Sequence, residues 1–370
     1  MAECQRQSVL QRQSIERARV RAPMKSASAS MTRALHLAGL LALVLSAGAS
    51  AGELPRLFAA VNAGVVEILA TQAGPPIPQD SQLLPESGLG SGFLISRDGL
   101  VMTAAHVVHV ADVVYVRFLH GQVSQAHVIA SDERADVALV RVERVPDEAV
   151  VIVLGNSDEV QVGDEAFVVG APYGLSHTLT VGYISARHRT VRAGSHGAQP
   201  EFFQTDAVIN RGNSGGPLFN MKGEAIGVVS LIVSSTGGYE GFGFALTSNT
   251  ARHLLLEERA IWTGVDFIVL SGETARILNV PQAAGLLVLR VAADSAAAKA
   301  GLRGGTRSVV VDGEPVLLGG DIVLRVNDIA LDSPDNRQQA WEAIRLAPSG
   351  SIVRVKILRA GQISELTIER

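Results

Sequence analysis

The chain has 370 residues and a formal net charge of −4, and 47% of its residues are hydrophobic while 18% are charged. This length is enough for about two or three domains with cores of their own, and this composition excludes a chain that is disordered throughout. The balance is slightly acidic, whereas binding to nucleic acid needs clustered positive charge, so we expect no nucleic-acid partner.

An apolar run near the N-terminus has the form of an export signal. Residues 37–49 read LAGLLALVLSAGA, and Ala49-Ser50-Ala51 supplies the small-residue cleavage pattern of a secretory signal peptide. The long basic stretch that precedes the run leaves the start codon open. We expect residues 1–51 to be leader and signal peptide, cleavage after Ala51, and a periplasmic or otherwise exported protein. An uncleaved signal anchor with peripheral membrane association is the alternative.

Removal of this leader changes the charge and the cysteine content. It takes away seven Lys and Arg and two Asp and Glu, which moves the net charge from −4 to about −9, and it removes Cys4, the single cysteine. A mature chain without cysteine suits an oxidising compartment and must be stabilised by its cores. The chain has no Cys/His cluster with zinc-ligand spacing and no GxxxxGKS loop, so we expect no metal and no cofactor.

Short apolar runs of strand length, separated by turn residues, occupy the chain from about residue 55 to residue 250. The expected strands are residues 91–96, 112–118, 127–131, 137–142, 165–170 and 224–230. Residues 97–99 and 221–223 predict hairpin turns, and residues 71–87, rich in Pro, Gln and Ser, predict a surface loop. Many short strands with regular turns favour barrels or sandwiches over a helical or doubly wound fold.

The pattern changes near residue 254. The stretch LLLEERAIW at 254–262 predicts a short helix that links two domains. Further on, residues 295–301 predict a helix that ends at a glycine, and Ser333 as N-cap before Pro334 predicts a helix to Arg345. The tail is therefore expected to be a second, smaller α/β domain.

Ser214 lies in NRGNSGGP at 210–217, a stretch that composition alone assigns to an ordinary turn. A serine becomes a nucleophile when a base takes its proton and a carboxylate orients that base. His106 follows an expected strand in LVMTAAHVV, and Asp136 opens the strand ADVALVRV, with Asp206 as a rival acid. The order His106, Asp136, Ser214 is that of the chymotrypsin-type triad.

Blocks along the chain resemble HtrA-type (Deg-type) serine proteases with one PDZ domain. The matching blocks are GSGFLIS (90–96), TAAHV (103–107), DVAL (136–139), GAPYG (170–174), QTDAVINRGNSGGPLF (204–219), GFGFAL (241–246), AGLLVLRVAADSAAAKAGL (284–302) and GDIVLRVNDIAL (320–331). The resemblance implies a mainly β fold with two six-stranded antiparallel chymotrypsin-like barrels, followed by a small α/β PDZ domain. The implied boundaries are 55–256 for the protease domain, 257–263 for a linker and 264–370 for the PDZ domain.

The resemblance further implies a serine endopeptidase and assigns a role to each residue of its site. His106 would be the general base and later acid, Asp136 would fix its tautomer, and Ser214 would be the nucleophile. The backbone N–H groups of Gly212, Asn213 and Ser214 would form the oxyanion hole, because glycine permits positive φ and leaves the N–H groups accessible.

The primary specificity pocket is expected just before the nucleophile and on a strand after it, at Val208, Ile209, Ser230 and Leu231. This lining has no carboxylate to receive Lys or Arg, which predicts cleavage after small or medium aliphatic residues. The same side chains fit the core of the second barrel equally well.

In the implied PDZ domain, C-terminal peptides would add as a strand beside WTGVDF at 262–267, with Trp262, Thr263, Gly264 and Val265 at the binding edge. Thr263 departs from the family pattern, so ligand preference and peptide binding itself stay open.

The basic loop 187–201 is the hypothesised sensor that couples the PDZ domain to the site, through Arg187 or Arg189. A solvated loop is the plainer interpretation of the same residues.

The predicted function is an exported endopeptidase of protein quality control that degrades unfolded or damaged proteins, and the resemblance implies a homotrimer. The alternative is a PDZ-bearing chaperone or scaffold with little or no protease activity, against which the intact triad argues. A third interpretation, a signalling protease opened by a peptide on the PDZ domain, differs only in its control.

Overall fold

The computed structural model describes residues 52–71, 88–171, 177–189, 200–232, 241–258, 260–311 and 314–370. Residues 54–370 form one unit and residues 1–53 another. The predicted signal peptide with its cleavage site lies outside the described residues, as does nearly all of the predicted loop 71–87.

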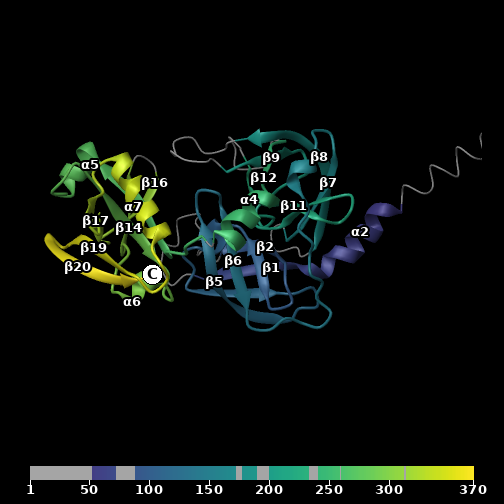
Figure 1. Ribbon diagram of the computed structural model, residues 1–370, viewed down its shortest axis with the longest axis horizontal. Helices are drawn as coiled ribbons and strands as arrows, with labels where there is room; N and C mark the ends of the chain where they lie inside the picture. Colours follow the sequence, from purple (N-terminus) through teal and green to yellow (C-terminus); the bar gives the residue numbers. More distant parts are fainter. Residues whose placement is uncertain are drawn as a thin grey trace, which may run out of the picture. The chain divides into compact units, whose positions relative to one another are not determined.

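Six strands of the first half close into an antiparallel barrel with the order β1-β2-β3-β6-β5-β4 (Figure 1). The barrel follows helix α2 (Glu53–Val61) and the 3-10 turn η1 (Asn62–Gly64), and its strands are β1 (Val65–Thr71), β2 (Gly88–Leu94), β3 (Leu100–Thr103), β4 (Val113–Arg117), β5 (Val123–Asp132) and β6 (Val137–Val142). Side chains alternate between the interior and solvent, as in β4, where Val114 and Val116 are buried and Tyr115 is exposed.

The second barrel repeats the connectivity of the first, since its order read from β7 is β7-β8-β9-β12-β11-β10. Its strands are β7 (Glu165–Gly170), β8 (Thr178–Arg189), β9 (Phe202–Thr205), β10 (Pro217–Asn220), β11 (Ala225–Ile232) and β12 (Gly243–Thr247), and the short turn η2 (Ser157–Glu159) precedes them. The expected pair of six-stranded antiparallel barrels is confirmed. Both predicted hairpin turns are present, with Gly99 and Gly223 at positive φ.

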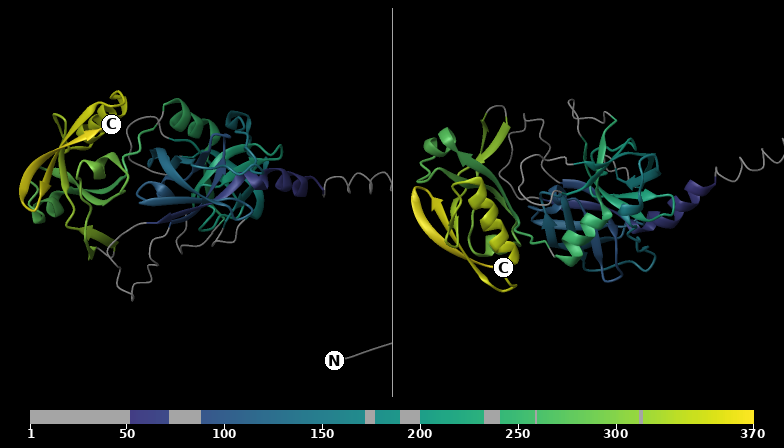
Figure 2. Two further views of the ribbon diagram at one scale, coloured as in Figure 1. Left: turned by 90° about the horizontal axis from the view of Figure 1, so that it is seen from below. Right: turned by 45° about the horizontal axis from the view of Figure 1, so that its top comes forward.

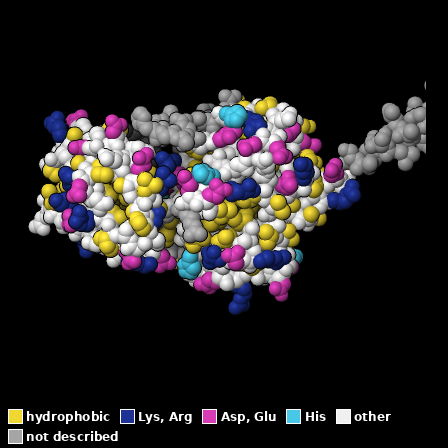
Figure 3. Space-filling view, in the orientation of Figure 1, with side chains coloured by type: hydrophobic (Ala, Val, Ile, Leu, Met, Phe, Trp, Pro, Cys, Tyr) yellow, Lys and Arg dark blue, Asp and Glu magenta, His cyan; other side chains and the backbone are white. Residues whose placement is uncertain are grey.

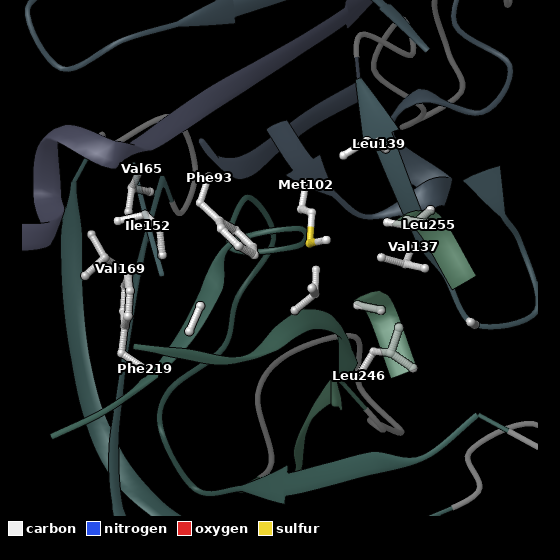
Figure 4. Close-up of a cluster of buried hydrophobic side chains, with 14 of the residues drawn as sticks. Val65, Phe93, Met102, Val137, Leu139, Ile152, Val169, Phe219, Leu246 and Leu255 are labelled. Carbon is white, nitrogen blue, oxygen red and sulfur yellow. The ribbon is translucent and has the colours of Figure 1, made fainter. Parts of the chain in front are cut away.

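An inter-barrel cluster of buried apolar side chains joins the two barrels (Figure 4). Phe93 and Met102 come from the first barrel, and Phe219 comes from the second, where its ring stacks on Phe167 with centroids 4.9 Å apart. Leu255 enters the same cluster from the π-helical turn η4 (His253–Glu257), which continues helix α4 (Ser248–Arg252). The helix predicted over 254–262 is therefore shifted to 248–257, because its leucines pack on the barrels instead of bridging to the tail.

The C-terminal region is a sheet of order β13-β14-β17-β19-β20, with β18 paired to β17, and a separate hairpin β15-β16. Its elements are β13 (Val265–Ser271), α5 (Gly272–Ile277), β14 (Ala284–Val291), α6 (Ala296–Lys299), β15 (Arg307–Val311), β16 (Glu314–Leu318), β17 (Ile322–Val326), β18 (Ile329–Ala330), α7 (Pro334–Leu346), β19 (Ile352–Arg359) and β20 (Gln362–Glu369). Helix α7 packs on this sheet through Ala340 (Figure 2). The predicted N-cap Ser333 is confirmed, since it accepts a backbone hydrogen bond from the first turn of α7, and Ser295 caps α6 in the same way. This region fits the expected PDZ domain.

Charged side chains of both signs are mixed over the face of the molecule drawn in Figure 3. Among the described residues, no helix has the length and the hydrophobicity that a membrane span requires.

Candidate active site

His106 lies on α3 (Ala105–Val108), a single helical turn that directly follows β3. Ala105, Val107 and Val108 are buried in the first barrel and hold this turn in place, while the His106 side chain is 49% exposed. The apolar neighbours therefore anchor the turn, and the imidazole faces solvent from a fixed position.

Asp136 lies in the turn between β5 and β6, at φ 55°, and its side chain is buried. Positive φ is uncommon for residues other than glycine, and aspartate and asparagine adopt it more readily than most. The Nδ1 atom of His106 lies 2.9 Å from each carboxylate oxygen of Asp136, and the His106 backbone N–H donates to Oδ1 at 3.0 Å. The structure therefore brings together the two residues that the sequence predicted as base and acid.

The charge state of Asp136 follows from its surroundings. Burial by itself raises the pKa of the Asp136 carboxyl, but the hydrogen bonds from His106 and Ser230 and the charge of His106 outweigh burial, so the pKa is lowered overall. An ionised carboxylate at Nδ1 accepts a hydrogen bond, which fixes the imidazole proton on Nδ1 and leaves Nε2 as the acceptor.

Ser230 on β11 is buried, and its hydroxyl donates to Asp136 Oδ2 at 2.5 Å. Ser230 was predicted to line the specificity pocket, whereas in the structure its hydroxyl is bound to the predicted acid Asp136. A serine within the apolar run EAIGVVS was the available signal, because a buried hydroxyl needs a hydrogen-bond partner.

Ser214 lies in the irregular segment between β9 and β10 and is half-buried. Gly212 and Gly215 beside it adopt φ values of 103° and 84°. A Cβ atom on Gly215 would lie 2.3 Å from both the Ser91 carbonyl oxygen and the Thr103 hydroxyl. Gly215 is thus required by its backbone conformation and by the closeness of the first barrel.

The backbone N–H of Asn213 donates to the Asn210 carbonyl oxygen at 3.0 Å, which closes a turn inside the loop. This corrects the expectation that all three predicted oxyanion donors face the substrate, because this N–H already has an acceptor. The Gly212 and Ser214 N–H groups remain the candidates.

The other predicted pocket residues do not form one surface. Val208 is 40% exposed, whereas Ile209 is buried within the core of the second barrel. The side chain of Leu231 lies outside the described part of the structure. The rival acid, Asp206, accepts a hydrogen bond from the Tyr183 backbone N–H at 2.6 Å within the second barrel.

The residues predicted for the PDZ edge divide into two pairs. Trp262 donates from Nε1 to the His109 carbonyl oxygen at 2.7 Å, and the Thr263 hydroxyl lies 3.3 Å from His109 Nε2. Gly264 accepts a hydrogen bond from the Ala292 N–H at 2.8 Å, and Val265 is the buried first residue of β13. Trp262 and Thr263 therefore contact the residue that follows α3 in the first barrel.

Arg187, a partly buried residue of β8, is held against the second barrel. Its guanidinium donates to the carbonyl oxygens of Asp158 and Val160 and lies 5.7 Å from the centroid of the Phe203 ring. This corrects the hypothesis that Arg187 reaches toward the PDZ domain. The Arg189 side chain, most of the predicted sensor loop and residues 172–176 of the GAPYG region lie outside the described residues.

Within the ranges that the structure describes, no group of three or more His, Cys, Asp or Glu side chains is placed to hold a metal ion.

The chain has relatives among known proteins. Residues 90–228 match the family described as the trypsin-like peptidase domain. The chain is 38% identical over 240 residues to a "Probable periplasmic serine endoprotease DegP-like" of Pseudomonas fulva (strain 12-X), which covers 63% of this chain and 49% of that protein. A protein of the same name from Halomonas elongata is 35% identical over 301 residues, which cover 79% of this chain and 59% of that protein.

Among solved structures, the "HtrA-type protease AlgW with tripeptide" aligns with 28% identity and a TM-score of 0.48, over 85% of this chain and 95% of that chain. The chain spans about half the length of the curated relatives that it matches. Residues 90–228 therefore carry a trypsin-like peptidase domain, and the chain is similar to serine endoproteases named DegP-like.

Proposed function

We propose that this protein is a serine endopeptidase with His106 as general base, Asp136 as the residue that orients it and Ser214 as nucleophile. The observation that carries the proposal is the contact between the His106 imidazole and the buried Asp136 carboxylate at 2.9 Å. It supports the proposal because a neutral imidazole held in this tautomer can accept the proton of a serine hydroxyl.

In the proposed reaction, Ser214 Oγ forms a bond to the carbonyl carbon of the substrate while its proton passes to His106. The π electrons of the carbonyl move to the oxygen, and the tetrahedral intermediate then expels the amine, which takes the proton from His106. Water repeats the same steps on the acyl-enzyme and releases the second product.

The Gly212 and Ser214 N–H groups are the proposed donors to the developing oxyanion. Both belong to the glycine-containing loop, where Gly212 at φ 103° carries no side chain that would block the approach of a substrate carbonyl. Loss of one such donor typically costs about 2.7–4 kcal/mol of transition-state stabilisation.

The proposed substrates are unfolded or damaged proteins in the periplasm or another exported location. The names of the relatives, which are periplasmic serine endoproteases, and the export signal in the sequence support this location. Val208, an exposed aliphatic side chain before the nucleophile, supports cleavage after small or medium aliphatic residues. N-terminal sequencing of the exported protein tests the location and the cleavage after Ala51 together.

The C-terminal region is proposed to bind the C-terminus of a peptide. Its edge strand β13 supports this proposal, because Phe267 and Val269 are exposed there and an edge strand has backbone groups available for strand addition. A homotrimer is proposed on the family resemblance alone, and sedimentation equilibrium of the exported chain tests it.

The experiment that tests the peptidase is digestion of unfolded casein by the full chain, compared with its Ser214→Ala variant. We expect fragments from the parent chain and none from Ser214→Ala, while Ser308→Ala, at an exposed serine of β15, cleaves like the parent. A parent chain that leaves casein intact but keeps it from aggregating would instead support the chaperone or scaffold.

A further inference from the structure

The segment 206–216 between β9 and β10 carries Ser214 and is called the nucleophile loop below. The buried side chain of Ser91, on β2 of the first barrel, contacts this loop of the second barrel. Its hydroxyl donates to the Gly212 carbonyl oxygen at 2.6 Å and accepts from the Ala171 N–H at 2.9 Å. Its backbone N–H donates to the Ser214 carbonyl oxygen at 2.8 Å. One residue of the first barrel thus binds two carbonyl groups of the loop that carries the nucleophile.

The peptide unit between Gly212 and Asn213 is held at both ends. Its carbonyl oxygen accepts from the Ser91 hydroxyl, and its N–H donates to the Asn210 carbonyl oxygen at 3.0 Å. Because a peptide unit is planar, two hydrogen bonds at opposite ends fix its orientation. This plane lies directly between the two N–H groups that we propose as oxyanion donors.

The next two peptide units are also held by hydrogen bonds. The Asn213 carbonyl oxygen accepts from the Gly216 N–H at 2.9 Å, and the carbonyl and N–H of a trans peptide point in opposite directions, so this bond directs the Ser214 N–H away from Gly216. Beyond it, the Gly215 N–H donates to the Val229 carbonyl oxygen at 2.6 Å, opposite the bond from Ser91 to the Ser214 carbonyl. The direction of the Ser214 N–H therefore depends on these bonds directly. That of the Gly212 N–H depends on them through the Gly212 Cα, which joins its peptide unit to the Gly212–Asn213 plane.

We propose that the Ser91 hydroxyl is a positioning residue for the oxyanion hole, which it sets by holding the Gly212 carbonyl from the opposite barrel. This inference rests on the proposed peptidase function. Without the hydroxyl, the Gly212 carbonyl and the Ala171 N–H both lose their partner, and the Gly212–Asn213 plane is held at one end only. The Gly212 N–H then no longer has a fixed direction toward the substrate oxygen.

A matched control exists within the second barrel. Ser248, also buried, donates from its hydroxyl to the Gly155 carbonyl oxygen at 2.7 Å. Ser248→Ala removes the same kind of buried hydroxyl-to-carbonyl hydrogen bond as Ser91→Ala, and this bond ends on Gly155 instead of the nucleophile loop. A loss of activity that comes only from destabilisation should appear in both variants, whereas a loss of activity that comes from the oxyanion hole should appear only in Ser91→Ala.

The test measures kcat and KM on a peptide substrate and the inhibition constant of a peptide aldehyde, for the full chain and the two variants. The aldehyde forms a hemiacetal with a serine and places its oxygen where the oxyanion forms. For Ser91→Ala we expect kcat to fall by about 100-fold with KM little changed, and aldehyde affinity to fall by a comparable factor. For Ser248→Ala we expect both values to stay within about threefold of the parent chain.

The outcomes distinguish failure of the proposed peptidase function from failure of the role proposed for Ser91. A parent chain that cleaves nothing overturns the proposed function. A parent chain that cleaves, with Ser91→Ala retaining its kcat and its aldehyde affinity or with Ser248→Ala losing as much, overturns the role of Ser91 alone. If Ser91→Ala does not fold, Ser91→Cys, which keeps a weaker donor, is measured in its place. Its kcat and its aldehyde affinity should then fall below those of the parent chain, but by less than about 100-fold.

Discussion

The two barrels share one strand order, and the connection between their third and fourth strands carries a proposed catalytic residue in each. In the first barrel this connection runs from β3 to β4 and holds His106, and in the second it runs from β9 to β10 and holds Ser214. The first connection begins with a helical turn, whereas the second is an irregular segment with two glycines at positive φ.

The difference follows from what each connection has to present. A base acts through its side chain, so the backbone of its connection can form a helical turn with buried apolar neighbours. A nucleophile with an oxyanion hole also presents backbone N–H groups, so its connection cannot use all of them in regular structure. The second connection is held instead by bonds from Ser91 and Val229.

The largest expected effect tests whether the two connections act as one unit. We expect His106→Ala and Ser214→Ala each to lower kcat by about six orders of magnitude, and the double variant to lose no more than either single variant. The measurement is the initial rate of peptide hydrolysis. Losses that multiply in the double variant would contradict a shared catalytic step.

Replacement of Asp136 tests how much the orientation of the His106 imidazole contributes, because His106 itself stays in place. We expect Asp136→Asn to lower kcat by about 10⁴-fold, because the amide favours the wrong imidazole tautomer.

The same substitution has a signature in stability. The pKa of Asp136 is lowered in the folded protein, so its stabilisation is complete above the unfolded pKa, about 3.9, and is lost as the pH falls through the lower folded value. In urea unfolding between about pH 6 and pH 2, the free energy of unfolding should therefore fall more steeply with decreasing pH for the parent chain than for Asp136→Asn. Parallel curves would contradict the lowered pKa.

Gly215→Ala probes the contact between the nucleophile connection and the first barrel. Its Cβ would lie 2.3 Å from Ser91 and Thr103 atoms, so we expect a loss of about 3 kcal/mol in the free energy of unfolding. Gly163→Ala, at φ 96° with open space around it, should lose only about 1 kcal/mol. Equal losses in urea unfolding would show that the backbone conformation alone matters at residue 215.

The smallest expected effect concerns the hydrogen bond from Ser230, in the second barrel, to Asp136, in the first. Ser230→Ala removes one of the hydrogen bonds that lower the Asp136 pKa, while those from His106 remain. We expect kcat to fall about tenfold, consistent with a net hydrogen bond to a charged group of about 1.5 kcal/mol. A loss as large as that of Asp136→Asn would assign Ser230 a larger role than one supporting contact.

Local patterns predicted much of this fold. The strands at 137–142 and 165–170 have the predicted bounds, and the predicted N-cap at Ser333 is present, because alternation and capping depend on neighbours in sequence. The pairing of His106 with Asp136 was predicted from the order of the motifs along the chain.

The remaining contacts could not be predicted because they join distant segments. Ser230 lies 94 positions from Asp136, and Ser91 lies 121 positions from Gly212, so a local pattern can indicate a buried hydroxyl but cannot identify its partner. Arg187 was assigned to a sensor from the charge of its loop, but its guanidinium donates to carbonyl groups that only the folded barrel brings near.

The inter-barrel cluster has a consequence for how damage to this protein would be detected. The proposed base and acid belong to one barrel and the proposed nucleophile to the other, and the two barrels are joined by this apolar contact and by serine hydrogen bonds. A molecule with both barrels intact but slightly separated would keep its circular dichroism spectrum and lose turnover. Hydrolysis rate would then report the closure of two folded halves on each other, which spectroscopy of either half cannot measure.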